Sequence, residues 1–460
     1  MTVNQPPLLR QARALQDGAA RAAAYLHHIG ARRVNANTRH LDGFDFDLPR
    51  EGLPDDRVLE LIDRLGSDGT MASAAGRYFG YVIGGSLPAA SGTRALLAGW
   101  DQVADAPTGP SVVKMEEVAI NWVTSLLRLP DTTEGTFTTG ATMANLALIA
   151  TARDVLLDRQ GHGRQKGLMN APDLRVVASA ESHATVLKSL RLAGLGSDNV
   201  ERVPVDDQGR MIVDSMPKLD ARTLVLAQAG NVCSGASDPL DRIAERCEAS
   251  GAWLHVDGAF GLWARVSPLT HSPLAGLERA DSWVVDAHKT LNAPYDSGLA
   301  LCRHPEEMRA SMAIGAAYLP PVAPGPADLA PEFSRAARGA ETYAALLSLG
   351  SDGVIALVER FQTLAKRLAK GVRDLGFDVP HDIHFNQVFA HLPGEDARCG
   401  RIIDHVQNSG EAWFGAASWQ GRSGFRMSVS NWTTSDADID RLINALDRAL
   451  KETASPTGRK

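Results

Sequence analysis

Short apolar runs and segments of helical periodicity alternate through the middle of the chain. From Gly135 onward, apolar runs at 135–139, 174–180 and 223–228 are each followed by a segment with apolar residues at helical spacing. Further short apolar runs occupy 252–257, 283–287 and 298–302. This alternation predicts an α/β fold, with a mostly parallel central sheet and helices on both of its faces.

The flanking regions have different patterns. Residues 1–98 combine short helical patterns with loops rich in glycine and proline, which predicts an N-terminal arm or subdomain. A proline-rich loop at 321–333 precedes long helical patterns, and the end of the chain alternates short strands with helices. We therefore predict a large domain at 99–351 and a small C-terminal α+β domain at 352–460.

Composition narrows the function classes. The net charge of −7 argues against nucleic-acid and membrane-surface partners, because both need a basic field. The four cysteines are widely spaced without a CxxC pair, so we expect a reducing compartment and no metal site. No signal peptide and no uncharged membrane-spanning stretch is recognisable, which predicts a cytoplasmic protein.

Two charged residues stand at the ends of apolar runs. Asp257 ends the run at 252–257, and Lys289 follows the run at 283–287. The carboxyl ends of parallel strands form the ligand-binding edge of such a sheet, so both side chains are candidate site residues. Taken singly, Asp257 is better explained as a helix or turn cap and Lys289 as a solvated strand-end charge.

Two strand-to-helix turns add further candidates. Thr139, Gly140, Ala141 and Thr142 occupy one turn, where free backbone N–H groups make an anion site unless a threonine simply caps the helix. His183 opens the next helix, as a cap or as a site residue. Pyridoxal 5′-phosphate calls for all these groups together: a lysine for its aldehyde, an acid for its ring nitrogen, backbone donors for its phosphate and a stacking face.

Five stretches carry a family resemblance. They read HVDGAFG, DAHKTLNAPYDSG, TTGATMAN, ESHA and RYFGYVIGGSLPAA. From about Tyr78 to its end, the chain resembles the group II pyridoxal-phosphate-dependent amino-acid decarboxylases, which act on aromatic amino acids, histidine or glutamate. The resemblance implies a fold type I enzyme that binds pyridoxal 5′-phosphate. It also implies a homodimer with the active site at the subunit interface.

The resemblance assigns roles to individual residues of this chain. It implies that Lys289 is the Schiff-base lysine, that Asp257 partners the ring nitrogen and that His183 stacks on the ring. It further implies that Ala141 and Thr142 hold the phosphate.

Three further roles follow from the same resemblance. His288 would touch phosphate or substrate, and Asn231 would lie beside the cofactor. Tyr318, 29 residues after Lys289, would be the loop tyrosine that protonates the substrate carbon, unless it only anchors its loop. The chain departs from the family pattern at Thr290, where tryptophan is common, and in a shorter amino-terminal region and loop.

The substrate remains open among aromatic, acidic and aliphatic amino acids. Tyr78 and Phe79 are candidates for a pocket wall, and are otherwise explained as exposed or core aromatics. Arg426 is a candidate for a contact from the small domain, and is otherwise explained by pairing with a core carboxylate. Arg335 and Arg338 are interpreted as a carboxylate clamp or a surface pair at a helix start.

The function predicted is decarboxylation of an L-amino acid to the amine and CO₂. Three alternatives stay open on the same cofactor motifs: an aminotransferase, an amine-oxidising aldehyde synthase and a non-catalytic cofactor-binding protein.

Overall fold

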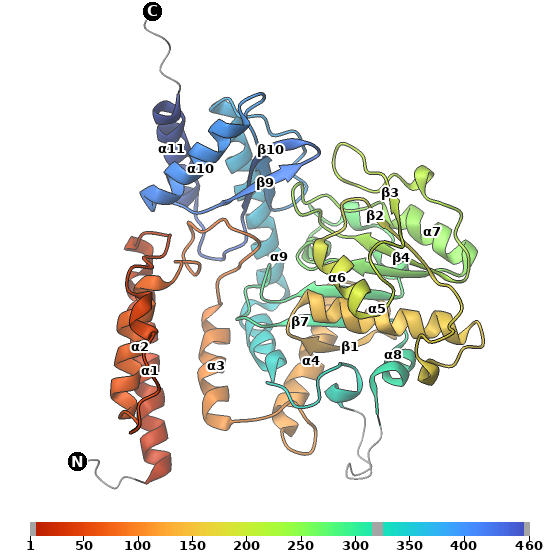
Figure 1. The fold of residues 1–460 in the computed structure, drawn as a ribbon, viewed down its shortest axis with the longest axis horizontal. Helices are drawn as coiled ribbons and strands as arrows, with labels where there is room; N and C mark the ends of the chain where they lie inside the picture. The colour runs from red at the N-terminus through yellow and green to blue at the C-terminus, as the bar shows by residue number, and fades with distance from the viewer. Residues whose placement is uncertain (1–5, 315–324, 455–460) are drawn as a thin grey trace, which may run out of the picture.

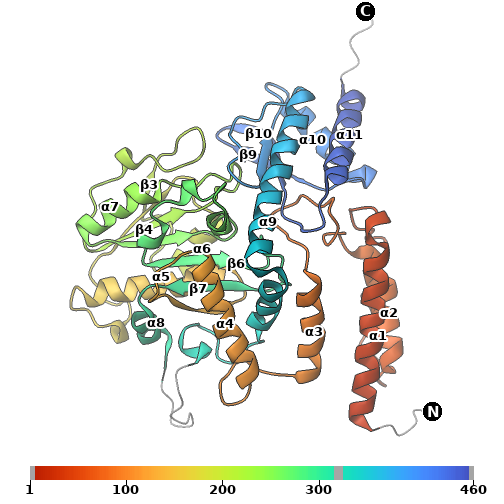
Figure 2. The same cartoon turned by 180° about the vertical axis from the view of Figure 1, so that it is seen from behind.

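The computed structural model describes residues 6–314 and 325–454 (Figures 1 and 2). Its central feature is a seven-stranded sheet with the order β1-β7-β6-β5-β4-β2-β3. β7 is antiparallel to both neighbours, and the other pairs are parallel, so the predicted α/β fold is confirmed. The strands are β1 Glu134–Thr138, β2 Arg175–Ser179, β3 Val200–Val203, β4 Thr223–Gln228, β5 Trp253–Asp257, β6 Ser282–Asp286 and β7 Gly298–Cys302.

Helices cover both faces of this sheet. β4 to β7 are buried at every position, as expected for strands covered on both sides. One face packs against α5 Ala141–Asp158, α6 Ala184–Leu192 and α8 Pro305–Met312. The other face packs against α4 Pro110–Leu126, α7 Leu240–Ser250 and the first part of α9 Arg338–Asp374.

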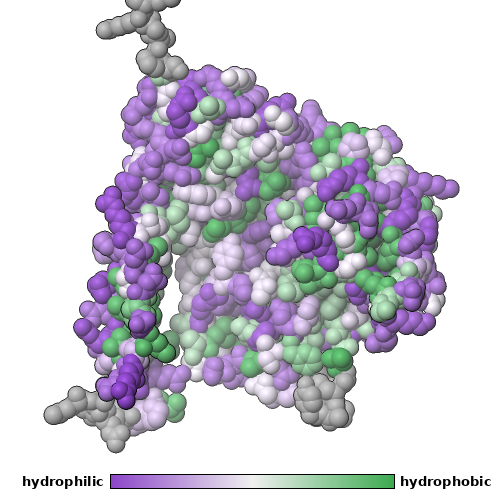
Figure 3. All heavy atoms as spheres, in the orientation of Figure 1, coloured by the Kyte–Doolittle hydropathy of each residue, from purple (hydrophilic) through white to green (hydrophobic). Residues whose placement is uncertain are grey.

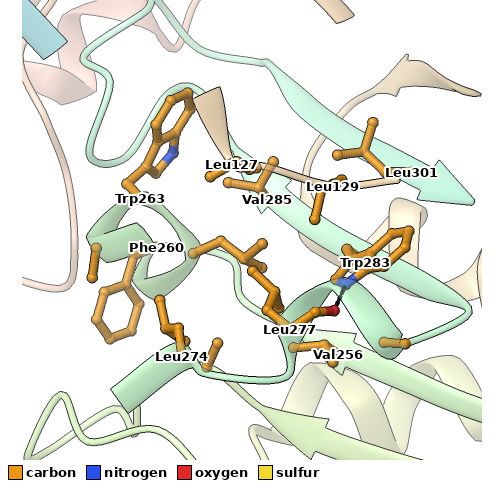
Figure 4. Packing of buried hydrophobic residues seen from close by; sticks show 14 of the residues in the cluster. Leu127, Leu129, Val256, Phe260, Trp263, Leu274, Leu277, Trp283, Val285 and Leu301 are labelled. Carbon is orange, nitrogen blue, oxygen red and sulfur yellow. Dashed lines mark hydrogen bonds between the residues drawn. The ribbon is translucent and has the colours of Figure 1, made fainter. Parts of the chain in front are cut away.

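Large aromatic side chains fill the core on the α4 side of the sheet (Figure 4). Trp283 of β6 is fully buried and donates from Nε1 to the carbonyl oxygen of Leu277 at 2.9 Å. Trp263 is also fully buried and donates from Nε1 to the carbonyl oxygen of Asp286 at 3.0 Å. Both indoles therefore bury their apolar area without an unpaired N–H group, and Trp263 fixes the end of β6.

A smaller unit stands beside the large sheet. Its three antiparallel strands have the order β8-β10-β9, with bounds β8 Gln387–Ala390, β9 Gly415–Trp419 and β10 Arg422–Ser428. The second part of α9 packs on this sheet with α10 Asp396–Ser409 and α11 Asp436–Thr453. Within α9 the backbone of Gly350 is not helical, with φ of 63°, one residue before the predicted boundary at 351 and 352. That domain boundary stays a prediction.

The N-terminal helices form an arm. α1 Pro7–His28 and α2 Asp55–Gly66 stand apart from the large sheet, and α3 Pro88–Trp100 packs against α9 (Figures 1 and 2). Hydrophobic residues lie among hydrophilic ones along α1 and α2, on the side next to the open space in this view (Figure 3). The predicted boundary at 98 and 99 falls inside α3 and also stays a prediction. Among the described residues, no helix combines the length and apolarity needed to cross a membrane.

Candidate active site

A cavity of about 420 Å³ opens at the carboxyl edge of the large sheet. Its wall includes the last residues of three adjacent parallel strands, Gln228 of β4, Asp257 of β5 and Asp286 of β6. The turn between β1 and α5 closes one side, and Arg426 of β10 reaches in from the smaller unit. The cavity therefore occupies the position where open α/β sheets bind ligands.

The start of α5 presents two unused backbone donors to this cavity. No described residue accepts a hydrogen bond from the N–H groups of Ala141 and Thr142, which we call the α5 amide pair. The residue before the helix is Gly140, so neither Thr139 nor Thr142 caps it. Gly140 has φ of 151°, a region that favours glycine, and a Cβ there would lie 3.3 Å from Cε1 of His288. The helix start is thus shaped to receive an anion.

His183 is both the cap of a helix and a residue of the cavity wall. As the N-cap of α6, its Nδ1 accepts from the backbone N–H of Thr185 at 3.3 Å. Its ring also lies on the cavity wall. The surrounding protein lowers the pKa of His183 by desolvation, Asp257 opposes this effect and Lys289 adds to it.

Asp257 is almost fully buried, with 7% of its surface exposed. Its Oδ1 accepts from the N–H of Ala259 at 3.2 Å, which is the turn contact that the sequence allowed. Its Oδ2 accepts from Nδ2 of Asn145, on α5, at 3.3 Å. The carboxylate is held by donors from α5 and from the turn after β5 while it faces the cavity.

Lys289 lies within the same cavity and contacts a second carboxylate. Its Nζ is 3.2 Å from Oδ2 of Asp286, and Nε2 of His288 is 3.6 Å from the same oxygen. The other oxygen of Asp286 is buried without a hydrogen-bond partner among the described residues. Burial lowers the pKa of His288, while Asp286 acts in the opposite direction.

Sequence reasoning missed Asp286 and Tyr295. Asp286 ends β6 as Asp257 ends β5, so the strand-end argument would have found it. The ring of Tyr295 packs on His288, with centroids 4.2 Å apart, and it also lines the cavity. Both residues lie in the stretch DAHKTLNAPYDSG that was singled out for its lysine.

Two predicted substrate residues lie elsewhere. Phe79 is fully buried in the core of the smaller unit, and Tyr78 is 4% exposed and stacks on Trp413 at 5.1 Å. Neither lines the cavity, because both side chains pack in the protein interior. Tyr81, three residues further on, stands on the cavity wall instead and is 62% exposed.

The side chain of Asn231 is also turned away from the cavity. It is fully buried, and it donates from Nδ2 to Glu181 at 2.7 Å while its Oδ1 accepts from the N–H of Cys233 at 2.9 Å. Its neighbours Gly230 and Val232 line the cavity in its place. The side chain of Asn231 thus holds its loop in place, and its predicted position beside the cofactor stays a prediction.

The remaining candidates differ in outcome. Arg426 lines the cavity, and its Nη1 donates to the carbonyl oxygen of Val232 at 2.9 Å. Arg335 and Arg338 pair with Glu116 and Asp296, at 2.8 Å and 2.6 Å, and do not line the cavity. Tyr318 lies outside the described residues.

The donors and acceptors fit pyridoxal phosphate. The α5 amide pair suits its phosphate, the buried acceptor at Asp257 suits its ring nitrogen, and the amine of Lys289 suits its aldehyde. All of them face one cavity.

Solved structures superpose on nearly the whole of this chain. Oryza sativa TDC, solved with PLP and tryptamine, superposes with a TM-score of 0.90 at 21% identity, over 98% of this chain and 100% of that one. Mouse CSAD gives a TM-score of 0.88 at 23% identity, over 97% and 99%. At these identities the likeness establishes the fold.

The family follows from the sequence match. Residues 87–392 match the pyridoxal-dependent decarboxylase conserved domain, and the chain belongs to this family of lyases, whose cofactor is pyridoxal phosphate. It is 28% identical to the L-2,4-diaminobutyrate decarboxylase of Rhizobium meliloti, over 79% of this chain and 74% of that enzyme. It is 32% identical to the aromatic-L-amino-acid decarboxylase of Bacillus atrophaeus over 46% of this chain, and the match spans 44% of that enzyme's length.

Proposed function

We propose that the protein decarboxylates an L-amino acid to the corresponding amine and CO₂. The observation that carries this proposal is the meeting of Lys289, Asp257 and the α5 amide pair in one cavity of a chain from this family. When bound, pyridoxal phosphate supplies an electron sink for the electron pair that the departing CO₂ leaves behind. The chain's own residues hold the cofactor and control the protons.

Five groups contact the cofactor or the substrate in this proposal. The α5 amide pair donates to the phosphate, and Asp257 accepts from the ring nitrogen and keeps its proton in place. Lys289 attaches covalently as the nucleophile once its amine has lost a proton. His183 faces the ring. His288 touches the phosphate or the substrate, supported by its closeness to Gly140 at the start of α5.

Substrate contacts are proposed for Arg426 and Tyr81. No described carboxylate pairs with Arg426, so its guanidinium suits an anionic group of the substrate. Tyr81 takes the wall position first expected of Tyr78 and Phe79. Tyr318 is proposed as the proton donor to the substrate carbon.

The functional unit is proposed to be a cytoplasmic homodimer. α1 buries none of its side chains within one chain, and Leu8, Leu9 and Leu26 are more than half exposed. An arm with this much apolar surface is stabilised by packing against a second copy. The four cysteines are free, which agrees with a reducing compartment. Sedimentation of the full chain should give the mass of two chains, and Leu8→Asp with Leu9→Asp should shift it toward one.

The test of the activity is a substrate screen. The purified protein, loaded with pyridoxal phosphate, is incubated with each common L-amino acid in the absence of any keto acid, and CO₂ and amine are measured. The proposal predicts equimolar CO₂ and amine from at least one of them. Spectral change without CO₂ from every amino acid contradicts it.

An aminotransferase is the second candidate, and Arg426 is the observation that favours it. An arginine without a carboxylate partner can hold the α-carboxylate of a substrate that is not decarboxylated. This activity requires a keto acid as acceptor and releases no CO₂. An amine-oxidising aldehyde synthase would instead release CO₂ with aldehyde and ammonia, so measuring the products separates all three.

A further inference from the structure

A row of buried polar side chains runs from the middle of β5 to Asp257. Trp253, His255 and Asp257 alternate along β5 and so point to the same face of the sheet. α5 covers that face and contributes Asn145, four residues after its first residue. Ser282 of β6 is the register partner of His255. Trp253 is 1% exposed, and Ser282, His255 and Asn145 are fully buried.

These side chains form one continuous set of hydrogen bonds. Nε1 of Trp253 lies 3.1 Å from Oγ of Ser282, which lies 2.9 Å from Nδ1 of His255. Nε2 of His255 lies 2.8 Å from Oδ1 of Asn145, whose Nδ2 lies 3.3 Å from Oδ2 of Asp257. We call this set the Asp257 network.

The chemistry of its two ends fixes the direction of the network. An indole N–H can only donate, so Ser282 accepts from Trp253, and the need for a donor at the Asp257 end places the hydroxyl proton of Ser282 toward Nδ1 of His255. The proton of the neutral imidazole is then on Nε2, and Asn145 accepts it with Oδ1. The amide group of Asn145 is left to donate to Asp257, and an ionised carboxylate can only accept. Every hydrogen bond therefore donates toward Asp257.

Burial keeps the imidazole of His255, in the middle of the Asp257 network, uncharged. Desolvation lowers the pKa of His255 from 6.5 to about 4, while Asp257 acts in the opposite direction. The imidazole therefore carries no charge near neutral pH and holds a single tautomer. A protonated imidazole would donate from both nitrogens, and Ser282 could then no longer donate to it.

We propose that Asn145 and His255 are positioning residues that keep Asp257 ionised and aimed at the ring nitrogen of the bound cofactor. This inference rests on the proposed role of Asp257. α5 then locates the cofactor at both ends, through the amide pair at its start and through Asn145 one turn later. The network also prevents the Asn145 amide from turning its oxygen toward the carboxylate, which would raise the cost of the negative charge.

The test removes the hydrogen-bond donors that lead to Asp257. Asn145→Asp replaces the donor beside Asp257 with an acceptor, and His255→Leu removes the donor that orients Asn145. The readout is the ¹⁵N resonance of ring-labelled pyridoxal phosphate bound to the protein near neutral pH, which reports whether the ring nitrogen carries a proton. Asp257→Asn is the reference for a lost acceptor. Thr151→Val removes a different buried hydroxyl of α5, one that donates to the carbonyl oxygen of Ala147, and is the matched control.

The expected result is a protonated ring nitrogen in the wild type and in Thr151→Val, and an unprotonated one in Asp257→Asn. Asn145→Asp and His255→Leu should move toward the unprotonated resonance and retain the cofactor about tenfold less tightly, the value of one hydrogen bond to a charged group. His255→Gln, which keeps a donor for Asn145, should restore the wild-type resonance.

Two failures are distinguishable. Wild-type resonances in Asn145→Asp and His255→Leu, with a shifted Asp257→Asn, would overturn the positioning role alone. A ring nitrogen that stays protonated in Asp257→Asn would overturn the role of Asp257 on which the inference rests. If Asn145→Asp does not fold, His255→Leu and its His255→Gln counterpart decide the question by themselves.

Discussion

Nζ of Lys289 lies 3.2 Å from Oδ2 of Asp286, a carboxylate that is 1% exposed at the end of β6. Asp257 occupies the end of the adjacent β5. Two neighbouring strand ends thus provide two carboxylates with different partners: Asp286 contacts the amine of Lys289 and the imidazole of His288, whereas Asp257 accepts from amides. This difference suits separate roles, with Asp286 beside the reactive amine and Asp257 beside the cofactor ring.

The contact between Asp286 and Lys289 can be measured by a double-mutant cycle. Asp286→Asn and Lys289→Met each leave the partner charge unpaired, so each should lower the free energy of unfolding of the cofactor-free protein by about 1–3 kcal/mol. The double variant should lose about 1 kcal/mol less than the sum of the two single losses. This coupling energy is small because the lysine side chain is 23% exposed, so solvent weakens the ion pair. Urea unfolding measures all four proteins, and additive losses would mean that the pair contributes no coupling.

The carboxylate of Asp257 is predicted to matter for chemistry more than for binding. Asp257→Asn keeps the shape but not the charge that holds the ring proton, so turnover should fall at least about a hundredfold, or ~3 kcal/mol, while the cofactor is retained. Asp281→Asn, just before β6 at the opposite end of the strand, is the control and should leave turnover unchanged. Activity of Asp257→Asn within a few-fold of wild type would refute the role.

His255 predicts a specific dependence of stability on pH. Its pKa is about 4 in the folded protein, below the ordinary 6.5 that applies to the unfolded chain. The unfolded state therefore binds an extra proton between these values, and His255 contributes stability that is present above about pH 6.5 and lost toward pH 4, about 3 kcal/mol in all. Urea unfolding across this window measures the free energy of unfolding at each pH. Its slope against pH should be smaller for His255→Leu than for the wild type, by the uptake of up to one proton on unfolding. Parallel curves would contradict a neutral buried imidazole.

Tyr318→Phe should separate CO₂ release from the step that follows it. The substitution removes only the hydroxyl, and loss of CO₂ needs no proton donor, whereas the substrate carbon does need one afterwards. We expect CO₂ release to continue while amine falls and carbonyl product and ammonia rise through reaction with oxygen. Amine, carbonyl product and ammonia are measured from one substrate in both proteins. An unchanged product ratio would assign the proton to another group.

The positions of the strand ends could be predicted because each is marked by a short apolar run in the local sequence. The apolar runs before Asp257 and Lys289 predict buried strands, and parallel strands bring such ends together. The turn before α5 was predictable for the same reason. Asp286 follows from the same rule, because it ends β6 as Asp257 ends β5.

Side-chain direction in irregular segments was not predictable. In RYFGY no periodicity indicates which aromatic ring faces the cavity, and the packing of Trp413 against Tyr78 decides it. Asn231 turns toward Glu181, which lies 50 residues earlier in the sequence and meets it only in the folded protein. The Asp257 network depends likewise on the contact between α5 and β5, which no local pattern reveals.

Trapping the cofactor on its lysine tests the central claim most directly. The holoprotein is reduced with borohydride, digested and mapped by mass spectrometry, with Lys289→Arg treated in parallel. The account predicts a pyridoxyl group on the peptide that contains Lys289 and none in the variant. A pyridoxyl group on any other lysine of the wild type, or cofactor that is retained yet never fixed by reduction, would contradict it.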